Sequence, residues 1–262
     1  MPKPNSRRGD LTREQIVSAA LACLDRSGLD DFSLREVARE LGVFPTALYW
    51  HVPGGRNVLL AEIAARVLEG VTPPCDPQVA WDDWLLDLFL RYRAAVRAHP
   101  NAAPLLGARL VSNTGVQIEM VEGILWALDR AGYAGAAIVD AYNAVVAGMV
   151  GFVTLELARA PDEDAAAWQA MQRDRVASVA AGSHAALARH AEMLTRDAFI
   201  LRWEDGRTRP MDRSYRAFAA YLIAGLKDGC PVPAKRRSSR SPAAGKASAR
   251  GKAAAARAPS RR

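Results

Sequence analysis

Hydrophobic positions in the first 70 residues recur every three to four residues in short runs, which is the spacing of one face of an α-helix. The first run begins at Thr12, which forms the pattern of a capping box with Gln15, and it ends at Gly28. The pattern predicts a helix between Thr12 and Gly28. Its apolar stripe consists of Ile16, Ala20, Cys23 and Leu24.

The second run has its own start and stop signals. Ser33 and Glu36 form another capping pattern, and Phe32 and Val37 have the spacing of a hydrophobic staple. Gly42 follows the last apolar position and is expected to end this helix.

Two further helices are expected before residue 70. The third runs from about Pro45 to His51, since a proline at the first helical position loses no needed hydrogen bond. The Pro-Gly-Gly stretch at 53–55 then interrupts the helical pattern. The fourth runs from about Asn57 to Gly70, and its inner face carries Leu59, Ile63 and Val67.

Residues 71–230 hold longer apolar runs, rich in alanine and again helical in period. They predict a helix ending near His99-Pro100, helices over Val116–Ala131 and Ala134–Arg159, and another ending over Phe199–Trp203. The last helix carries the stripe Tyr215, Phe218, Ala219, Leu222, Ile223 and Leu226. No run shows the sustained alternation of strands, and no repeat has a fixed period, so the expected fold class is all-α.

The expected helix from Ala134 is apolar on nearly all sides, which is typical of a buried helix. Its charge-free stretch, Ala141–Leu155, is shorter than the roughly 18–20 apolar residues that span a bilayer. The N-terminus lacks the apolar segment of a signal peptide. A soluble, cytoplasmic protein without membrane contact is therefore expected.

The net charge of +7 is distributed unevenly along the chain. Residues 1–70 carry nine basic and nine acidic residues, residues 71–230 carry sixteen and nineteen, and residues 231–262 carry ten and none. The last segment is also poor in large apolar residues, so a disordered basic tail is expected there. Cys23, Cys75 and Cys230 match no zinc or CxxC spacing, so we expect reduced thiols and neither a metal nor a cofactor.

The second and third expected helices, joined by a tight turn through Gly42-Val43, have the pattern of a helix-turn-helix. The turn needs a glycine where the chain reverses and an apolar residue, here Val43, that plugs it. A short second helix with exposed polar and aromatic groups fits the major groove of DNA, with its N-terminal residues near the base edges.

Two stretches of this region carry a family resemblance: Ser33-Leu34-Arg35-Glu36-Val37-Ala38-Arg39-Glu40-Leu41-Gly42-Val43 and Leu48-Tyr49-Trp50-His51-Val52. With them, the chain resembles the tetracycline-repressor (TetR) family of bacterial transcriptional regulators over about Leu11 to Leu60. A weaker similarity covers Leu125 to Leu157. The resemblance implies DNA-binding roles for Ser33, Arg35, Pro45, Thr46, Tyr49, Trp50 and His51.

Two positions depart from the family pattern. The family often places serine or threonine at the cap of the recognition helix, where this chain has Phe44, which cannot cap. A family lysine after that helix is replaced by Gly55, and the neighbouring Arg56 is a candidate for the missing phosphate contact. The sequence leaves two roles open for Tyr49, Trp50 and His51, namely packing in the core or contacting DNA. The N-terminal arm, residues 1–10, is either a groove-following segment or an ordinary disordered start.

The resemblance also implies that the helix from Ala134 and the last helix form a four-helix bundle between two subunits, so a homodimer is expected. Two recognition helices would then reach half-sites about 34–36 Å apart on DNA. A pocket for an unknown small-molecule effector is expected between the helices. Its candidate lining residues are Leu106, Ile124, Leu128, Tyr142, Asn143, Val146, Met149, Val150 and Phe152. His99 lies near a position where the tetracycline-binding branch uses a histidine, but its Ala-His-Pro context does not restore that metal–drug site.

The expected organisation is a flexible arm over 1–10, a DNA-binding domain over 11–70, a ligand-binding and dimerisation domain over 71–230, and the tail. The expected function is that of a ligand-responsive homodimeric repressor in the cytoplasm, associated with the nucleoid, whose partners are double-stranded operator DNA and a small molecule. One alternative is a non-specific architectural protein that binds DNA mainly through the basic tail. No phosphate loop, nucleophile elbow or metal-spaced cluster in the sequence supports an enzyme.

Overall fold

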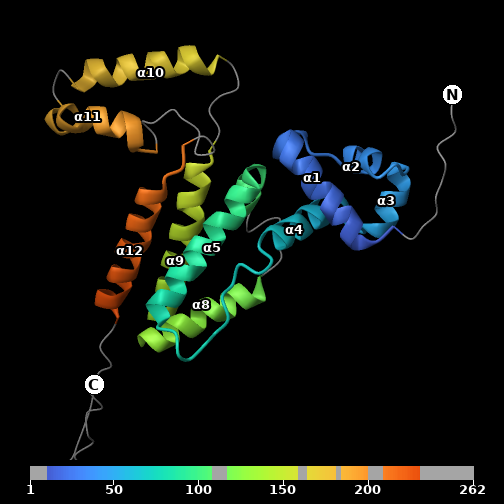
Figure 1. Ribbon diagram of the computed structural model, residues 1–262, viewed down its shortest axis with the longest axis horizontal. Coiled ribbons are helices and arrows are strands. Elements are labelled where there is room, and N and C mark those ends of the chain that lie inside the picture. Colours follow the sequence, from blue (N-terminus) through green and yellow to red (C-terminus); the bar gives the residue numbers. More distant parts are fainter. Residues whose placement is uncertain (1–10, 108–116, 159–163, 181–183, 200–208, 231–262) are drawn as a thin grey trace, which may run out of the picture. The chain divides into compact units, whose positions relative to one another are not determined.

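The computed structural model describes residues 11–107, 117–158, 164–180, 184–199 and 209–230 (Figure 1). Every regular element in these ranges is helical, which confirms the all-α fold. The expected N-terminal arm and basic tail lie outside the described residues, as do most residues of the expected helix end over 199–203.

The first helix, α1 (Arg13–Asp31), begins where the capping signal predicts. The Thr12 hydroxyl accepts a hydrogen bond from the backbone N–H of Gln15, and the Gln15 side chain accepts one from the backbone N–H of Thr12. Gly28 has a φ of +80° and interrupts the helix, as expected of a stop signal. One further turn continues to Asp31, because Leu29 is buried and holds the chain against the core.

The next three helices complete the region that is expected to bind DNA. Helix α2 (Leu34–Glu40) has Ser33 as its N-cap, and α3 (Pro45–His51) has the predicted bounds. Helix α4 (Gly55–Val67) begins two residues earlier than expected, because Gly54 is its N-cap in the left-handed conformation, with a φ of +99°. A Cβ atom on Gly54 would lie 2.4 Å from a methyl carbon of Val58, so only glycine fits there.

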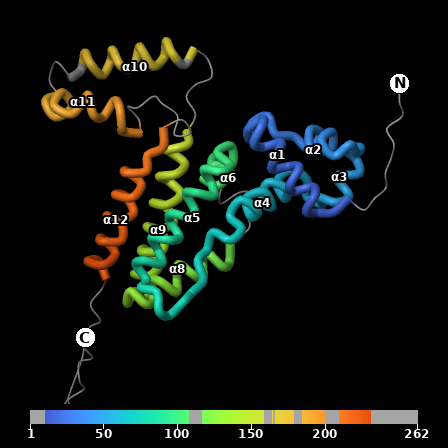
Figure 2. Tube along the Cα trace, viewed as in Figure 1, coloured from blue at the N-terminus to red at the C-terminus, as the bar shows by residue number. Residues whose placement is uncertain are grey.

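A connection over residues 68–80 leads from α4 to the helices of the second region, as the trace in Figure 2 shows. These are α5 (Trp81–Ala98), the 3₁₀ turn η1 (Pro100–Ala102), α6 (Ala103–Leu106), α8 (Ile118–Ala131), α9 (Ala136–Glu156), α10 (Ala165–Ala180), α11 (Ala185–Asp197) and α12 (Asp212–Gly229). Helices α5, α8, α9 and α12 pack on one another around a common core.

Helix α9 is shorter than predicted at both ends. Gly135 has a φ of +59°, so the helix begins at Ala136 and not at Ala134. By length and composition α9 could cross a membrane, with a mean hydropathy of 1.7 over 18 residues. It nevertheless carries a charged residue, Glu156, that is bound by arginines of α5, and it contacts α5, α8 and α12 as a bundle helix does.

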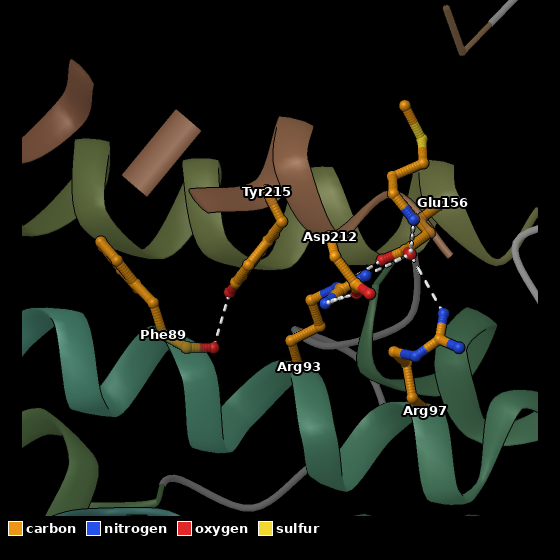
Figure 3. A network of polar contacts seen from close by, with 7 residues as sticks. Phe89, Arg93, Arg97, Glu156, Asp212 and Tyr215 are labelled. Atoms are coloured by element: carbon orange, nitrogen blue, oxygen red, sulfur yellow. Dashed lines mark hydrogen bonds and ion pairs between the residues drawn. The ribbon is translucent and has the colours of Figure 1, made fainter. Parts of the chain in front are cut away.

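Glu156 is the centre of a buried polar network that joins α5, α9 and the start of α12 (Figure 3). Its carboxylate accepts hydrogen bonds from Arg93 Nε at 2.8 Å and Arg93 Nη2 at 2.7 Å. It also accepts from Arg97 Nη1 at 3.0 Å and from the backbone N–H of Met211 at 2.9 Å. The network thus fixes the register of three helices with one carboxylate.

Arg93 extends the network toward α12. Its Nη1 lies 2.7 Å from an oxygen of Asp212, and its guanidinium lies 4.9 Å from the ring centre of Tyr215. The buried Tyr215 hydroxyl donates to the carbonyl of Phe89 at 2.7 Å, as Figure 3 shows. The first two turns of α12 are therefore bound to α5 by both charge and hydrogen bonding.

Candidate DNA-binding site

The turn between α2 and α3 has the backbone that a helix-turn-helix requires. Gly42 adopts a φ of +66°, and its N–H donates to the carbonyl of Arg39. The N–H of Val43 donates to the carbonyl of Ala38 at 3.0 Å, and the Val43 side chain packs against the core. Nothing lies within 4 Å of a Cβ built on Gly42, so the requirement for glycine here comes from backbone conformation and not from space.

Helix α3 has one buried and one open face. Leu48 and Val52 are completely buried in the core, which fixes the orientation of the helix. Tyr49 is 56% exposed and Trp50 is 87% exposed. Neither aromatic side chain is therefore a core residue, and their contact with DNA stays a prediction.

The remaining predicted contact residues of the two helices surround this open face. Arg35, Thr46 and His51 are exposed, and Ser33 and Pro45 are half-buried. The Ser33 hydroxyl accepts from the N–H of Glu36 at 3.3 Å, so its capping role is confirmed.

Arg56 has a structural role that the sequence did not indicate. Its Nη2 donates to the carbonyl of Leu29 at 2.8 Å and its Nε donates to the carbonyl of Phe32 at 3.3 Å. The guanidinium also lies 5.8 Å from the centre of the Phe32 ring. These contacts join α4 to the last turn of α1 and to Phe32, which follows it, and a phosphate contact by Arg56 stays a prediction.

Phe44 is the residue whose role sequence reasoning missed. Its side chain makes no capping hydrogen bond, as expected, yet α3 still begins at Pro45. The ring is 71% exposed, and Phe44 directly precedes the first residue of α3. The available signal was an aromatic residue at a capping position, directly before the helix that would enter a groove.

Arg13 is a second contributor that the sequence did not reveal. It forms an ion pair with Glu62 of α4, and its guanidinium donates to the carbonyl of His51 at the end of α3. The start of α1 is thus bound to both α3 and α4. Arg39, on the outer side of α2, is 81% exposed along its side chain and lies 3.7 Å from Glu36.

The candidate effector residues fall on α9 and on two helices that each contact it, α6 and α8. Leu106, Ile124, Leu128 and Met149 are buried, whereas Tyr142, Val146, Val150 and Phe152 are half-buried and Asn143 is exposed. Burial raises the pKa of the Tyr142 hydroxyl, so this side chain is neutral. The Phe152 ring packs edge-on against the rings of Phe199 and Tyr215. Whether these side chains line an effector pocket stays a prediction.

His99 has a protein partner in this structure. Its Nδ1 lies 2.8 Å from a carboxylate oxygen of Asp25 in α1. Within the described residues, no group of three or more His, Cys, Asp or Glu side chains is arranged to hold a metal ion.

Known proteins match this chain in sequence and in structure. The family model described as bacterial regulatory proteins of the tetR family matches residues 16–63, from near the start of α1 into α4. An HTH-type transcriptional regulator of Saccharopolyspora erythraea is 33% identical over 156 residues, which are 59% of this chain and 65% of that protein. The tetracycline repressor protein class A from transposon 1721 of Escherichia coli is 31% identical over 156 residues, 57% of this chain and 68% of that protein.

The solved structures agree with the sequence matches. Mycobacterium smegmatis BioQ has a TM-score of 0.59 and 26% identity, over 83% of this chain and 98% of its own. The chain spans between about half and two thirds of the length of the first curated relatives it matches, with 46% for the class D tetracycline repressor of Escherichia coli. The class A repressor is similar over more than two thirds of its length, and the family model covers the helix-turn-helix itself. The chain belongs to the TetR family of bacterial regulatory proteins.

Proposed function

We propose that this chain is a transcriptional repressor that binds operator DNA as a homodimer and is released from it by a small molecule. The observation that carries the proposal is the open face of α3. Leu48 and Val52 anchor the helix on the core, while Tyr49 and Trp50 are directed to solvent. A folded domain gains nothing from exposing two large aromatic rings side by side, whereas a helix that enters the major groove needs such a face.

The relatives support a repressor. Several of them are named tetracycline repressor proteins, and the first is named an HTH-type transcriptional regulator. The proposal transfers the operator-binding role to residues 11–70 and the effector role to residues 71–230. It assigns no catalytic step and no cofactor to the chain, and it places the protein in the cytoplasm, on the nucleoid.

Helix α9 supports the dimer. Only 28% of its apolar window is buried within one chain, despite its mean hydropathy of 1.7. Val139 and Leu155 are exposed on it, and Tyr221 is 77% exposed on the neighbouring α12. Apolar surface of this kind is typical of a subunit interface, and a second copy of α9 and α12 would cover it.

The effector is proposed to bind among α6, α8 and α9, at the candidate residues given above. Its binding shifts the equilibrium between the DNA-bound and free states of the dimer. The size of this shift is set by the difference between the effector's affinities for the two states. The half-buried Tyr142 and Phe152 offer an apolar surface with one hydroxyl, which suits a largely apolar, aromatic molecule.

DNase I footprinting of the full chain on the DNA upstream of its own gene and of neighbouring genes tests the proposal. A protected, two-fold symmetric site is expected, with half-site centres one helical turn apart, about 34–36 Å. Arg35→Ala should weaken binding at least tenfold. Arg189→Ala, which removes an equally exposed arginine on α11, is the matched control and should leave the affinity unchanged. Absence of any protected site on these DNAs would refute the proposal.

A further inference from the structure

The base-reading side of this helix-turn-helix has an unusual composition. From Val43 to Gly55 the chain contains no arginine, lysine, asparagine or glutamine. Guanine is most often read in the major groove by arginine or lysine, and adenine by the paired hydrogen bonds of asparagine or glutamine. The first cation after α3, Arg56, is bound to the carbonyls of Leu29 and Phe32. Helix α3 therefore lacks the side chains that usually recognise purines.

Exposed side chains with apolar groups lie at the start of α3 instead. Phe44, the residue directly before α3, is 71% exposed, and Thr46 is exposed at the second position of the helix. The N-terminal residues of a recognition helix are the ones that lie near base edges, so these two side chains are placed for readout. Trp50, at the other end, lies farther from that position along the helix.

The major groove of DNA offers one apolar group, the C5-methyl of thymine. A phenylalanine ring and a threonine methyl both contact this group favourably, and neither pairs with the polar edge of a G·C pair. The fold does not need the exposed Phe44 ring, because it neither caps α3 nor lies in the core.

From this face we infer that Phe44, assisted by the methyl of Thr46, is a specificity-determining residue that reads thymine methyl groups. The operator half-site then carries thymines at the base pairs facing the N-terminal end of α3. Arg35 of α2, which is exposed, is left to contact a phosphate or a flanking guanine. The inference rests on the proposed function, since it concerns the same DNA-binding site.

Replacing single thymines of the footprinted operator by deoxyuridine tests the inference, because deoxyuridine lacks only the methyl group and keeps the hydrogen-bonding edge. Fluorescence anisotropy with the full chain measures the affinity for each duplex. Loss of one buried methyl contact corresponds to about a fourfold weaker affinity, and symmetric replacement in both half-sites to about fifteenfold. One or two thymines per half-site are expected to show this loss.

The variant Phe44→Ala should bind the thymine operator more weakly and lose its sensitivity to deoxyuridine at those positions. Phe44→Leu, which keeps an apolar side chain, should retain most of the sensitivity. Met171→Ala removes another exposed apolar side chain, 57% exposed on α10, and should keep both affinity and sensitivity. Since Phe44 is exposed, thermal melting should confirm that each variant is folded.

The outcomes separate the two proposals. A specific footprint together with equal affinities for thymine and deoxyuridine duplexes overturns the inference and leaves the repressor proposal standing. Retained deoxyuridine sensitivity in Phe44→Ala also overturns it, because another side chain must then read the methyl. Absence of a specific complex refutes the proposed function and the inference together.

Discussion

Replacing Glu156 by glutamine would remove the one negative charge at the centre of the buried network while keeping the shape of the side chain. In the wild type this fully buried carboxylate faces Arg93, whose side chain is only 11% exposed, and Arg97. Glutamine can still accept a hydrogen bond from the Met211 N–H and from one arginine. It leaves the buried Arg93 cation with only the exposed Asp212 as its counter-charge.

The size of the effect follows from this geometry. Breaking one side of a buried ion pair costs about 3–5 kcal/mol, and the retained hydrogen bonds place Glu156→Gln near the lower end. For a folded region of this size, each kcal/mol lowers Tm by about 2–4 °C, so a fall of about 6–12 °C is expected. The free energy of unfolding should decrease with no change in helical content at 25 °C.

The assay is thermal unfolding followed by circular dichroism, at one fixed protomer concentration because dimerisation makes Tm concentration-dependent. Asp87→Asn on α5 is the matched control, since it breaks an ion pair with Arg91 that is about half exposed on both sides. Exposed pairs of this kind contribute about 0.3–0.5 kcal/mol. A Tm for Glu156→Gln within 2 °C of the control would refute the argument.

The same network predicts a pH dependence. Burial raises the pKa of the Glu156 carboxyl, but the hydrogen bonds from Arg93 and Met211 outweigh it and hold the pKa below its ordinary value. A carboxyl whose pKa is lowered by folding stabilises the protein above its unfolded pKa, and this contribution is lost as the pH falls through the folded value. The wild type should therefore lose its Tm advantage over Glu156→Gln on acidification below about pH 4.5.

Substitutions at four other positions test the DNA-binding region. Leu48→Ala removes a fully buried side chain of α3 and should lower the free energy of unfolding, measured with urea, by about 2–5 kcal/mol. Trp50→Ala on the open face should change this stability little and DNA affinity strongly. Gly28→Ala should cost about 1–3 kcal/mol, because its φ of +80° and ψ of 176° fall in a region nearly restricted to glycine; an unchanged urea midpoint would contradict the assigned break. Thr12→Ala should cost about 1 kcal/mol through loss of the capping box, and Thr12→Ser should restore it.

Local signals predicted the helices of the DNA-binding region well. The capping hydrogen bonds at Thr12 and Ser33 span three residues, so the sequence contains everything that determines them. Pro45 and the Pro-Gly-Gly stretch fix the bounds of α3 in the same way. The orientation of Tyr49 and Trp50 was not predictable, because Leu-Tyr-Trp places three large residues in a row and helical spacing alone does not say which one is buried.

Contacts between distant residues left no local signal. Arg93 and Glu156 are 63 positions apart, and a glutamate at the end of an apolar helix gives no sign of its partner. The role of Arg56 was obscured for the same reason, since its partners are backbone carbonyls 24 and 27 residues away. The sequence thus predicted the helices of the DNA-binding region, while the exposed face of α3 and the side-chain network that holds the helices together required the structure.

The connection between the two regions explains how an effector can act on the open face of α3. Asp25 of α1 contacts His99 at 2.8 Å, and its carbonyl accepts from Asn101 Nδ2 at 2.7 Å, so α1 is bound to η1. The start of the same helix is bound through Arg13 to the end of α3. In the proposed repressor, a displacement of η1 would therefore be transmitted to α3 through α1. In the proposed repressor, linkage requires the reverse effect as well, because operator binding that fixes α1 must weaken effector binding by the same factor by which effector weakens operator binding.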